Sequence, residues 1–201
     1  MSEHFCVDFV ENELEESIVI ALKKTLPEKR LFHTIRVVDT VERLIELYGG
    51  NRSSLRLAAL LHDYAKPLTF SEMLMAIKRA NLSAPIDAEL YPEILHADAS
   101  AALAVVEFHI FDELTIRAIK AHTVGNEAMS VEDKILYLAD YVEDGRDFEG
   151  VNELRDLTYK NLDSAMLLGF DMSIAELVER KKLIHPMTIT CRNKLLLSRK
   201  V

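Results

Sequence analysis

The chain has 201 residues, 49% of them hydrophobic and only eleven of them glycine or proline, which suits one sizeable core and predicts a single domain over residues 1–201. Its 24 basic and 33 acidic residues give a net charge of −9, which argues against nucleic acid or an anionic membrane as partner. No apolar run approaches the roughly 18 residues of a membrane span, and the acidic N-terminus lacks a secretion signal, so we expect a soluble, cytoplasmic protein.

Apolar residues recur at intervals of three and four along almost the whole chain, whereas alternating β-branched runs are scarce. The expected fold class is therefore all-α. Pro27 can open the second helix, and Gly49 can end it. Asn51, Ser53 or Ser54 could cap the third helix. In chain order, we expect helices at about 9–25 and 27–48, a third that carries LAALLHD, and further helices at about 71–81, 92–108, 112–122, 130–143 and 151–183.

A proline and a glycine affect two of these helices, and the assignment of the C-terminal segment stays open. The third helix should end near Ala65, because Pro67 biases Lys66 away from helical angles and places it at a turn. The long helix near the C-terminus is expected to break near Gly169, since glycine weakens a helix interior. The segment 186–201 could be a short extended stretch followed by a helix, and its periodicity does not decide between assignments.

Six titratable side chains are expected to point inward from apolar helices or their ends. They are His33, His62, Asp63, His96, His122 and Asp140. A single inward histidine is usually a core residue bonded to a carbonyl. Six such groups without partners would each cost about 1–3 kcal/mol. A shared metal centre would satisfy all of them together.

The stretch LLHDYAK places Asp63 directly after His62. Because neighbouring helical residues diverge by roughly 100°, both can serve one site only near the end of the helix. A carboxylate has two oxygens, so Asp63 could bridge two ions while His62 binds one. Imidazole and carboxylate ligands suit iron, manganese or zinc. A two-metal site would hold a hydroxide ready for in-line attack on phosphorus, which indicates hydrolysis of a phosphate ester or anhydride.

The order of His33, the His62-Asp63 pair and Asp140 resembles the H…HD…D signature of the HD-domain phosphohydrolase superfamily. The words LLHDYAK, LHADASA, AHTVGNEAMS and ILYLADYVEDGR are similar to those of the YqeK-type symmetrical bis(5′-nucleosyl)-tetraphosphatases. The resemblance runs over residues 30–163. It implies a helical HD-domain bundle with a core at about 28–163 and helical extensions at both ends. The implied reaction is cleavage of diadenosine tetraphosphate into two ADP.

The same resemblance implies the roles of individual residues. One ion would be held by His33, His62, Asp63 and Asp140. The other would be held by Asp63, His96 and His122. Two divalent or mixed-valence ions are expected, with iron favoured and manganese or zinc open. The nucleotide-phosphate pocket would be lined by Arg30, Lys66, Thr123, Gly125 and Arg146. Asp63 and Lys66 are the expected catalytic residues, Lys66 by stabilising the charge that develops in phosphoryl transfer.

Simpler interpretations remain for the pocket residues, because Lys66 and Arg146 could be solvated cations and Gly125 a plain helix cap. Two other functions also remain open: an HD enzyme of mononucleotides, which one metal would serve, and a non-catalytic nucleotide sensor. His96 and His122 favour the dinuclear hydrolase over the first alternative, and the complete ligand set argues against the second. The expected ligand is a dinucleoside polyphosphate or an ADP-like nucleotide, and a homodimer is possible.

Overall fold

The computed structural model describes residues 10–198, and every regular element in that range is helical, which confirms the all-α class. The helices are α1 Glu13–Thr25, α2 Glu28–Tyr48, α3 Arg52–Leu61, α4 Phe70–Arg79, η2 Pro92–Ile94, α5 Leu95–Phe108, α6 Glu113–Ala121, α7 Val131–Val142, α8 Val151–Thr158, α9 Leu162–Glu179 and α10 Pro186–Ser198. Among the described residues, no helix combines the length and the hydrophobicity that crossing a bilayer requires.

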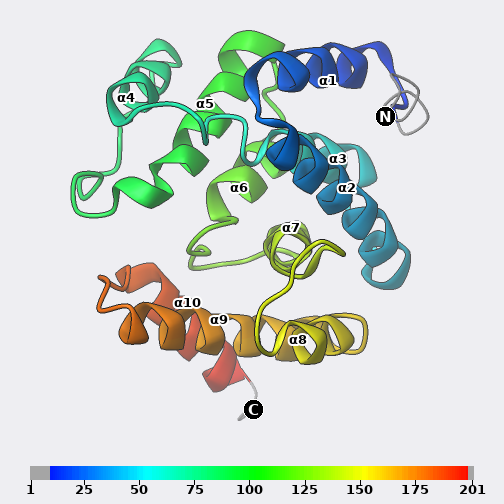
Figure 1. Cartoon of the computed structure of the whole chain (residues 1–201), viewed down its shortest axis with the longest axis vertical. Helices are drawn as coiled ribbons and strands as arrows, with labels where there is room; N and C mark the ends of the chain where they lie inside the picture. The colour runs from blue at the N-terminus through cyan, green and yellow to red at the C-terminus, as the bar shows by residue number, and fades with distance from the viewer. Residues whose placement is uncertain (1–9, 199–201) are drawn as a thin grey trace.

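The helices form two parts joined through α7. Helices α1 to α6 pack on one side, with α2 against α3 and α7, and α5 between α4 and α6. Helices α8 and α10 both pack on α9, which in turn contacts α7 (Figure 1). One continuous cluster of buried apolar side chains runs through both parts. Because α7 touches both parts, residues near its C-terminal end can contribute to a site between them.

Local capping chemistry sets most helix ends. Pro27 precedes α2, and Gly49 ends it with a φ of +74°, a backbone conformation that favours glycine. Of the three candidates for capping α3, Asn51 is the one whose side chain accepts a hydrogen bond, from the backbone N–H of Ser54. Helix α1 begins at Glu13, and residue 9 of the predicted helix lies outside the described range.

Helix α3 ends at Leu61, so the predicted end near Ala65 is wrong. The N–H of Ala65 donates to the Ser100 hydroxyl at 2.9 Å rather than continuing the helical ladder. The next backbone hydrogen bonds join residues three apart instead of four, such as the bond from the N–H of Lys66 to the carbonyl of Asp63. The chain therefore turns directly after α3, and His62 and Asp63 lie at the end of that helix, with His62 as its C-cap.

The break predicted near Gly169 is also wrong. The helical region is interrupted between Thr158 and Leu162, where the Asn161 side chain accepts from the N–H of Ser164 and starts α9. Gly169 lies inside α9 and is buried in the core. A capped start stabilises the new helix, whereas a single buried glycine is tolerated within one.

Two further boundaries refine the predictions. The helix expected at about 92–108 begins as the 3-10 turn η2 and becomes α-helical at Leu95. The segment whose assignment the sequence left open is helical from Pro186 to Ser198, as α10, and has no extended stretch at its start. Residues 199–201 lie outside the described range.

Candidate metal centre

Helices α2, α3, α5, α6 and α7 bring the six predicted inward residues together. Five of the six side chains are buried, and Asp140 is partly exposed. Ligand atoms within 4.8 Å of one another define two groups. The first group is His33, His62 and Asp140, and the second is Asp63, His96 and His122. Residues from five separate segments of the chain thus form two adjacent clusters of imidazole and carboxylate.

The carboxylate of Asp63 lies between the two groups. Its Oδ1 is 3.2 Å from Nε2 of His96 and 3.9 Å from Nε2 of His122. Its Oδ2 is 3.6 Å from Nε2 of His62 and 3.8 Å from Nε2 of His33. Burial would raise the pKa of Asp63, but the neighbouring His62 and His96 side chains hold it well below its usual value. An ionised carboxylate therefore faces each group with one oxygen.

Three histidines present an unprotonated Nε2 to the centre. The Nδ1 atoms of His62, His96 and His122 lie 2.8, 2.8 and 2.6 Å from backbone carbonyls. Because a carbonyl can only accept, each Nδ1 carries the proton and each Nε2 keeps its lone pair. The Nε2 atoms of His96 and His122 are only 3.2 Å apart, and Nε2 of His62 is buried without a hydrogen-bond partner. Such crowding of acceptor atoms fits a cation.

Burial also keeps two of these imidazoles in the neutral form. It lowers the pKa of His62, and it lowers the pKa of His122 to about 3. Metal ions bind the neutral imidazole, so at neutral pH neither residue must lose a proton on binding. The chemistry of these side chains therefore fits a metal ion in each group.

Glu143 is a site residue that the sequence analysis missed. Its Oε1 lies 3.1 Å from Nδ1 of His33, and Oε2 accepts from Nε of Arg36 at 2.5 Å and from the N–H of Gly145 at 2.6 Å. Burial would raise the pKa of Glu143, but the bonds with His33 and Arg36 lower it to about 2. The carboxylate thus holds the His33 proton on Nδ1 and turns Nε2 toward Asp140, 3.0 Å away. Glu143 follows Asp140 by about one helical turn in the stretch LADYVE, and this spacing could have identified it from the sequence.

Replacing Glu143 with glutamine should weaken metal binding by the first group. The amide keeps the shape but loses the charge that orients His33, and loss of such a partner typically costs about 10- to 100-fold in metal affinity. Chelator competition would measure the affinity of each ion. Glu132→Gln is a matched control, because Glu132 is another buried glutamate, at the start of α7, and it accepts from the backbone N–H of Asn51. Equal affinities in wild type and Glu143→Gln would contradict the role.

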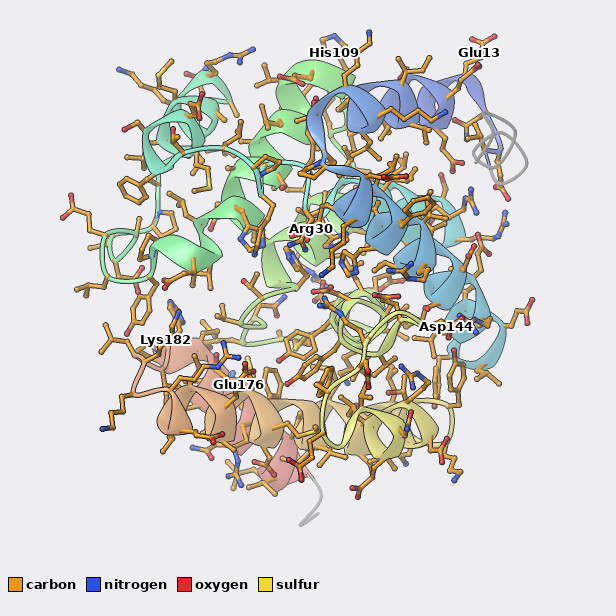
Figure 2. The ribbon with its side chains drawn as sticks, viewed as in Figure 1. Glu13, Arg30, His109, Asp144, Glu176 and Lys182 are labelled. Carbon is orange, nitrogen blue, oxygen red and sulfur yellow. The ribbon has the colours of Figure 1, made fainter. Side chains whose placement is uncertain are left out.

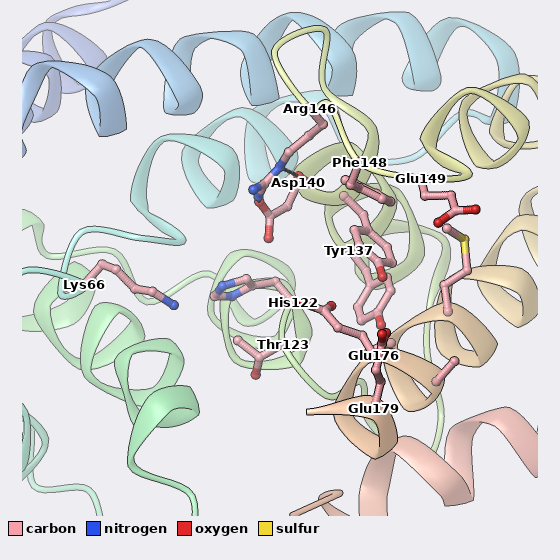
Figure 3. A pocket seen from close by; sticks show the side chains of 14 residues that line it. Lys66, His122, Thr123, Tyr137, Asp140, Arg146, Phe148, Glu149, Glu176 and Glu179 are labelled. Carbon is pink, nitrogen blue, oxygen red and sulfur yellow. Dashed lines mark hydrogen bonds and ion pairs between the residues drawn. The ribbon is translucent and has the colours of Figure 1, made fainter. Parts of the chain in front are cut away.

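A cavity of about 790 Å³ opens beside the two groups (Figure 3). His122 and Asp140 line it, and Lys66 and Arg146 extend toward them from different directions. The rings of Tyr137, Tyr141 and Phe148 and acidic residues of α9 also line it. This size is in the range of pockets that enclose small ligands, about 300–1,000 Å³. The cavity joins cations and aromatic rings to the candidate metal centre.

The three predicted cationic residues all contact the centre. Arg30, near the middle of the molecule in Figure 2, donates to Oδ2 of Asp63 at 2.5 Å. Arg146 donates to the side chain of Asp140 at 2.6 Å and to its carbonyl at 2.8 Å, so it is more than a solvated arginine. Lys66 Nζ lies 3.1 Å from both ring nitrogens of His96. Although much of Lys66 is exposed, burial of its ammonium group lowers its pKa.

The predicted pocket residues Thr123 and Gly125 differ in their placement. Thr123 lines the large cavity, whereas Gly125 lines a second, smaller one that also includes Thr123. Gly125 has a φ of +80°, and a β-carbon there would lie 2.8 Å from Sγ of Cys191 and 3.1 Å from the Phe170 ring. Glycine is therefore required by the turn and by packing against α9 and α10. Gly125 thus lies at the smaller cavity and not beside Lys66 and Arg146 in the large one.

Comparison with known proteins agrees with this arrangement. The HD domain family model matches residues 30–145. A Halalkalibacterium halodurans protein named symmetrical bis(5′-nucleosyl)-tetraphosphatase is 37% identical over 179 residues, covering 89% of this chain and 95% of its own. A Staphylococcus aureus protein of the same name is 34% identical over 173 residues, covering 85% and 89%.

A solved structure shares the fold. It is a Clostridium acetobutylicum protein, described as a predicted HD superfamily hydrolase involved in NAD metabolism. It aligns with a TM-score of 0.87 at 34% identity, over 91% of this chain and 97% of its own. The family match at residues 30–145 includes all six candidate ligands. The chain therefore belongs to the HD-domain family, with relatives named symmetrical bis(5′-nucleosyl)-tetraphosphatase among its members.

Proposed function

We propose that this chain is a metal-dependent hydrolase that splits diadenosine tetraphosphate into two ADP. The observation that carries the proposal is the Asp63 carboxylate, with one oxygen facing each imidazole group beside a cavity that presents Lys66 and Arg146. The names of the relatives supply the substrate. Six buried or nearly buried polar groups argue against a non-catalytic sensor. Burying them is energetically costly, and a site that had lost its catalytic function would have no physical reason to keep them.

The metal ligands in this proposal follow the two groups. One ion would bind His33, His62, Asp140 and one oxygen of Asp63. The second ion would bind His96, His122 and the other oxygen of Asp63. When bound, the ions would supply an activated water and neutralise charge on the phosphates. Iron is the metal that we propose, and this mixture of imidazole and carboxylate ligands also suits manganese and zinc.

The residues of the large cavity determine which phosphorus reacts. A tetraphosphate carries several negative charges toward a chain of net charge −9, so local cations must attract it. In our proposal, Lys66, Thr123 and Arg146 bind the first two phosphates, and the first nucleoside lies toward Tyr141 and Phe148. Those two rings already stack, with centroids 5.3 Å apart and planes 25° apart.

This placement presents the second phosphorus for attack by water. A new bond forms between the water oxygen and the second phosphorus. The bond between the second phosphorus and the oxygen that bridges it to the third phosphorus breaks. The first ADP keeps the oxygen of water, and the second ADP leaves with the bridging oxygen. Lys66, at the edge of the centre, would stabilise the negative charge that develops on the phosphoryl oxygens.

Hydrolysis in oxygen-18 water should therefore give only ADP, with the label in one of every two ADP molecules. Ion-exchange chromatography followed by mass spectrometry would measure both. Formation of ATP and AMP would refute the placement of the second phosphorus. Phosphate release from AMP without cleavage of diadenosine tetraphosphate would instead favour the mononucleotide enzyme.

A further inference from the structure

A second cavity, of about 250 Å³, adjoins the candidate active site. It is formed by the end of the α4–α5 connection, the turn after α6 and the start of α10, which are distant in the sequence. Figure 1 shows that the α4–α5 and α9–α10 connections lie on the same side of the molecule. An ion pair of 3.1 Å between Glu93 and Lys182 joins these two connections. Thr123 lines this cavity as well as the large one.

The walls of the second cavity are contiguous with the second group of candidate ligands. Leu95 lines the cavity, and the next residue, His96, belongs to that group. Thr123 lines the cavity, and the preceding residue, His122, belongs to the same group. The large cavity contacts the centre through His122 and Asp140. Because Thr123 lines both cavities beside His122, a linear molecule bound in the large cavity can extend past Thr123 toward the second one.

The chemistry of the second cavity suits a nucleoside. Tyr91 and His185 contribute rings whose centroids are 4.7 Å apart in an edge contact, and Ile94 and Leu95 add aliphatic surface. Such surfaces pack against the faces of a base. Nε2 of His185 lies 3.2 Å from Oδ2 of Asp87, whose side chain is 37% exposed, so the other oxygen of this carboxylate can accept from the edge of the base. The rings and the aliphatic surface match the two faces of a purine, and the carboxylate matches its N–H donors.

A cation lies at the same cavity. Lys120 lines it and pairs with Asp98 at 3.1 Å, and its side chain is 43% exposed. The ammonium group can therefore meet a phosphate oxygen next to the nucleoside. The volume is below the roughly 300–1,000 Å³ of pockets that enclose a complete small ligand. A base with part of its ribose fits this size better than a whole nucleotide.

From these contacts we infer that the second cavity binds the second nucleoside of a dinucleoside polyphosphate, the one that leaves as the other ADP. The inference rests on the proposed function and deepens it, because it assigns the two ends of the substrate to two cavities. Tyr91 supplies the ring against which the second base packs. The first nucleoside and its two phosphates remain in the large cavity.

The test compares two substrates in the metal-loaded enzyme. Adenosine 5′-tetraphosphate has the same first nucleoside and the same four phosphates as diadenosine tetraphosphate but lacks the second nucleoside. Attack at the same phosphorus would convert it to ADP and pyrophosphate. We expect wild-type KM to be lower for the dinucleoside. In Tyr91→Ala, KM for the dinucleoside should rise about tenfold, the effect of losing one base–aromatic contact, while KM for adenosine tetraphosphate stays unchanged.

Phe111→Ala is the matched control, because Phe111 is an aromatic residue that is 74% exposed and precedes α6 away from both cavities. It should change neither KM. Equal wild-type KM values for the two substrates, or an equal rise for both in Tyr91→Ala, would overturn the inference while leaving the proposed function intact. Failure of the wild-type enzyme to convert the dinucleoside to ADP would refute the proposed function itself. The wild-type comparison needs no variant, so it decides the matter even if Tyr91→Ala does not fold.

Discussion

Asp63→Ala is expected to abolish hydrolysis and to lower the content of both metal ions. The side chain lies within 3.9 Å of four imidazole nitrogens, and its two oxygens face different groups. In the proposed centre, its removal would take one ligand atom from each ion and the negative charge that offsets both. Elemental analysis of the purified variant would give metal per chain, and ADP production would give activity.

His122→Ala is the comparison that makes this result specific. His122 belongs to the second group only, so its loss should deplete chiefly one ion. Circular dichroism would verify that both variants keep their helices. Two ions per chain together with near-normal turnover in Asp63→Ala would show that this carboxylate does not bridge a dinuclear centre.

Lys66→Ala should reduce turnover by about 10²- to 10³-fold, the effect of removing one preorganised charge-stabilising donor. Lys66 lies at the turn after α3, and its ammonium group is beside His96 and the large cavity. Because we do not assign it as a metal ligand, the metal content of the variant should equal that of wild type. This combination separates Lys66 from Asp63, whose loss should affect both quantities.

A surface lysine provides the control for Lys66. Lys78, exposed on α4, should be replaceable by alanine without change in turnover or metal content. Single-turnover measurements at saturating substrate would show whether the loss in Lys66→Ala lies in the chemical step. Unchanged turnover in that variant would contradict the catalytic role. Lys66 would then be only a solvated lysine that precedes a proline.

The sequence determined the features that depend on neighbours along the chain. The helical period predicted the all-α class, and Asn51 was among the residues expected to cap α3. The inward histidines and aspartates were also identifiable, because polar residues within apolar helical stretches are costly unless they have partners. These inferences need only residue type and short spacing, which a single sequence contains.

The tertiary structure alone decided the features that join distant segments. The Ser100 hydroxyl accepts from the N–H of Ala65 in the turn that follows α3, and Glu143 orients His33 from more than a hundred positions away. The division of the six polar residues into two groups around Asp63 depends on the packing of five helices. The second cavity joins the surroundings of Tyr91, Thr123 and His185. The physical reason is that periodicity and capping report which face of a helix is buried and where it ends, whereas the partner of that face is chosen by packing between residues far apart in the chain.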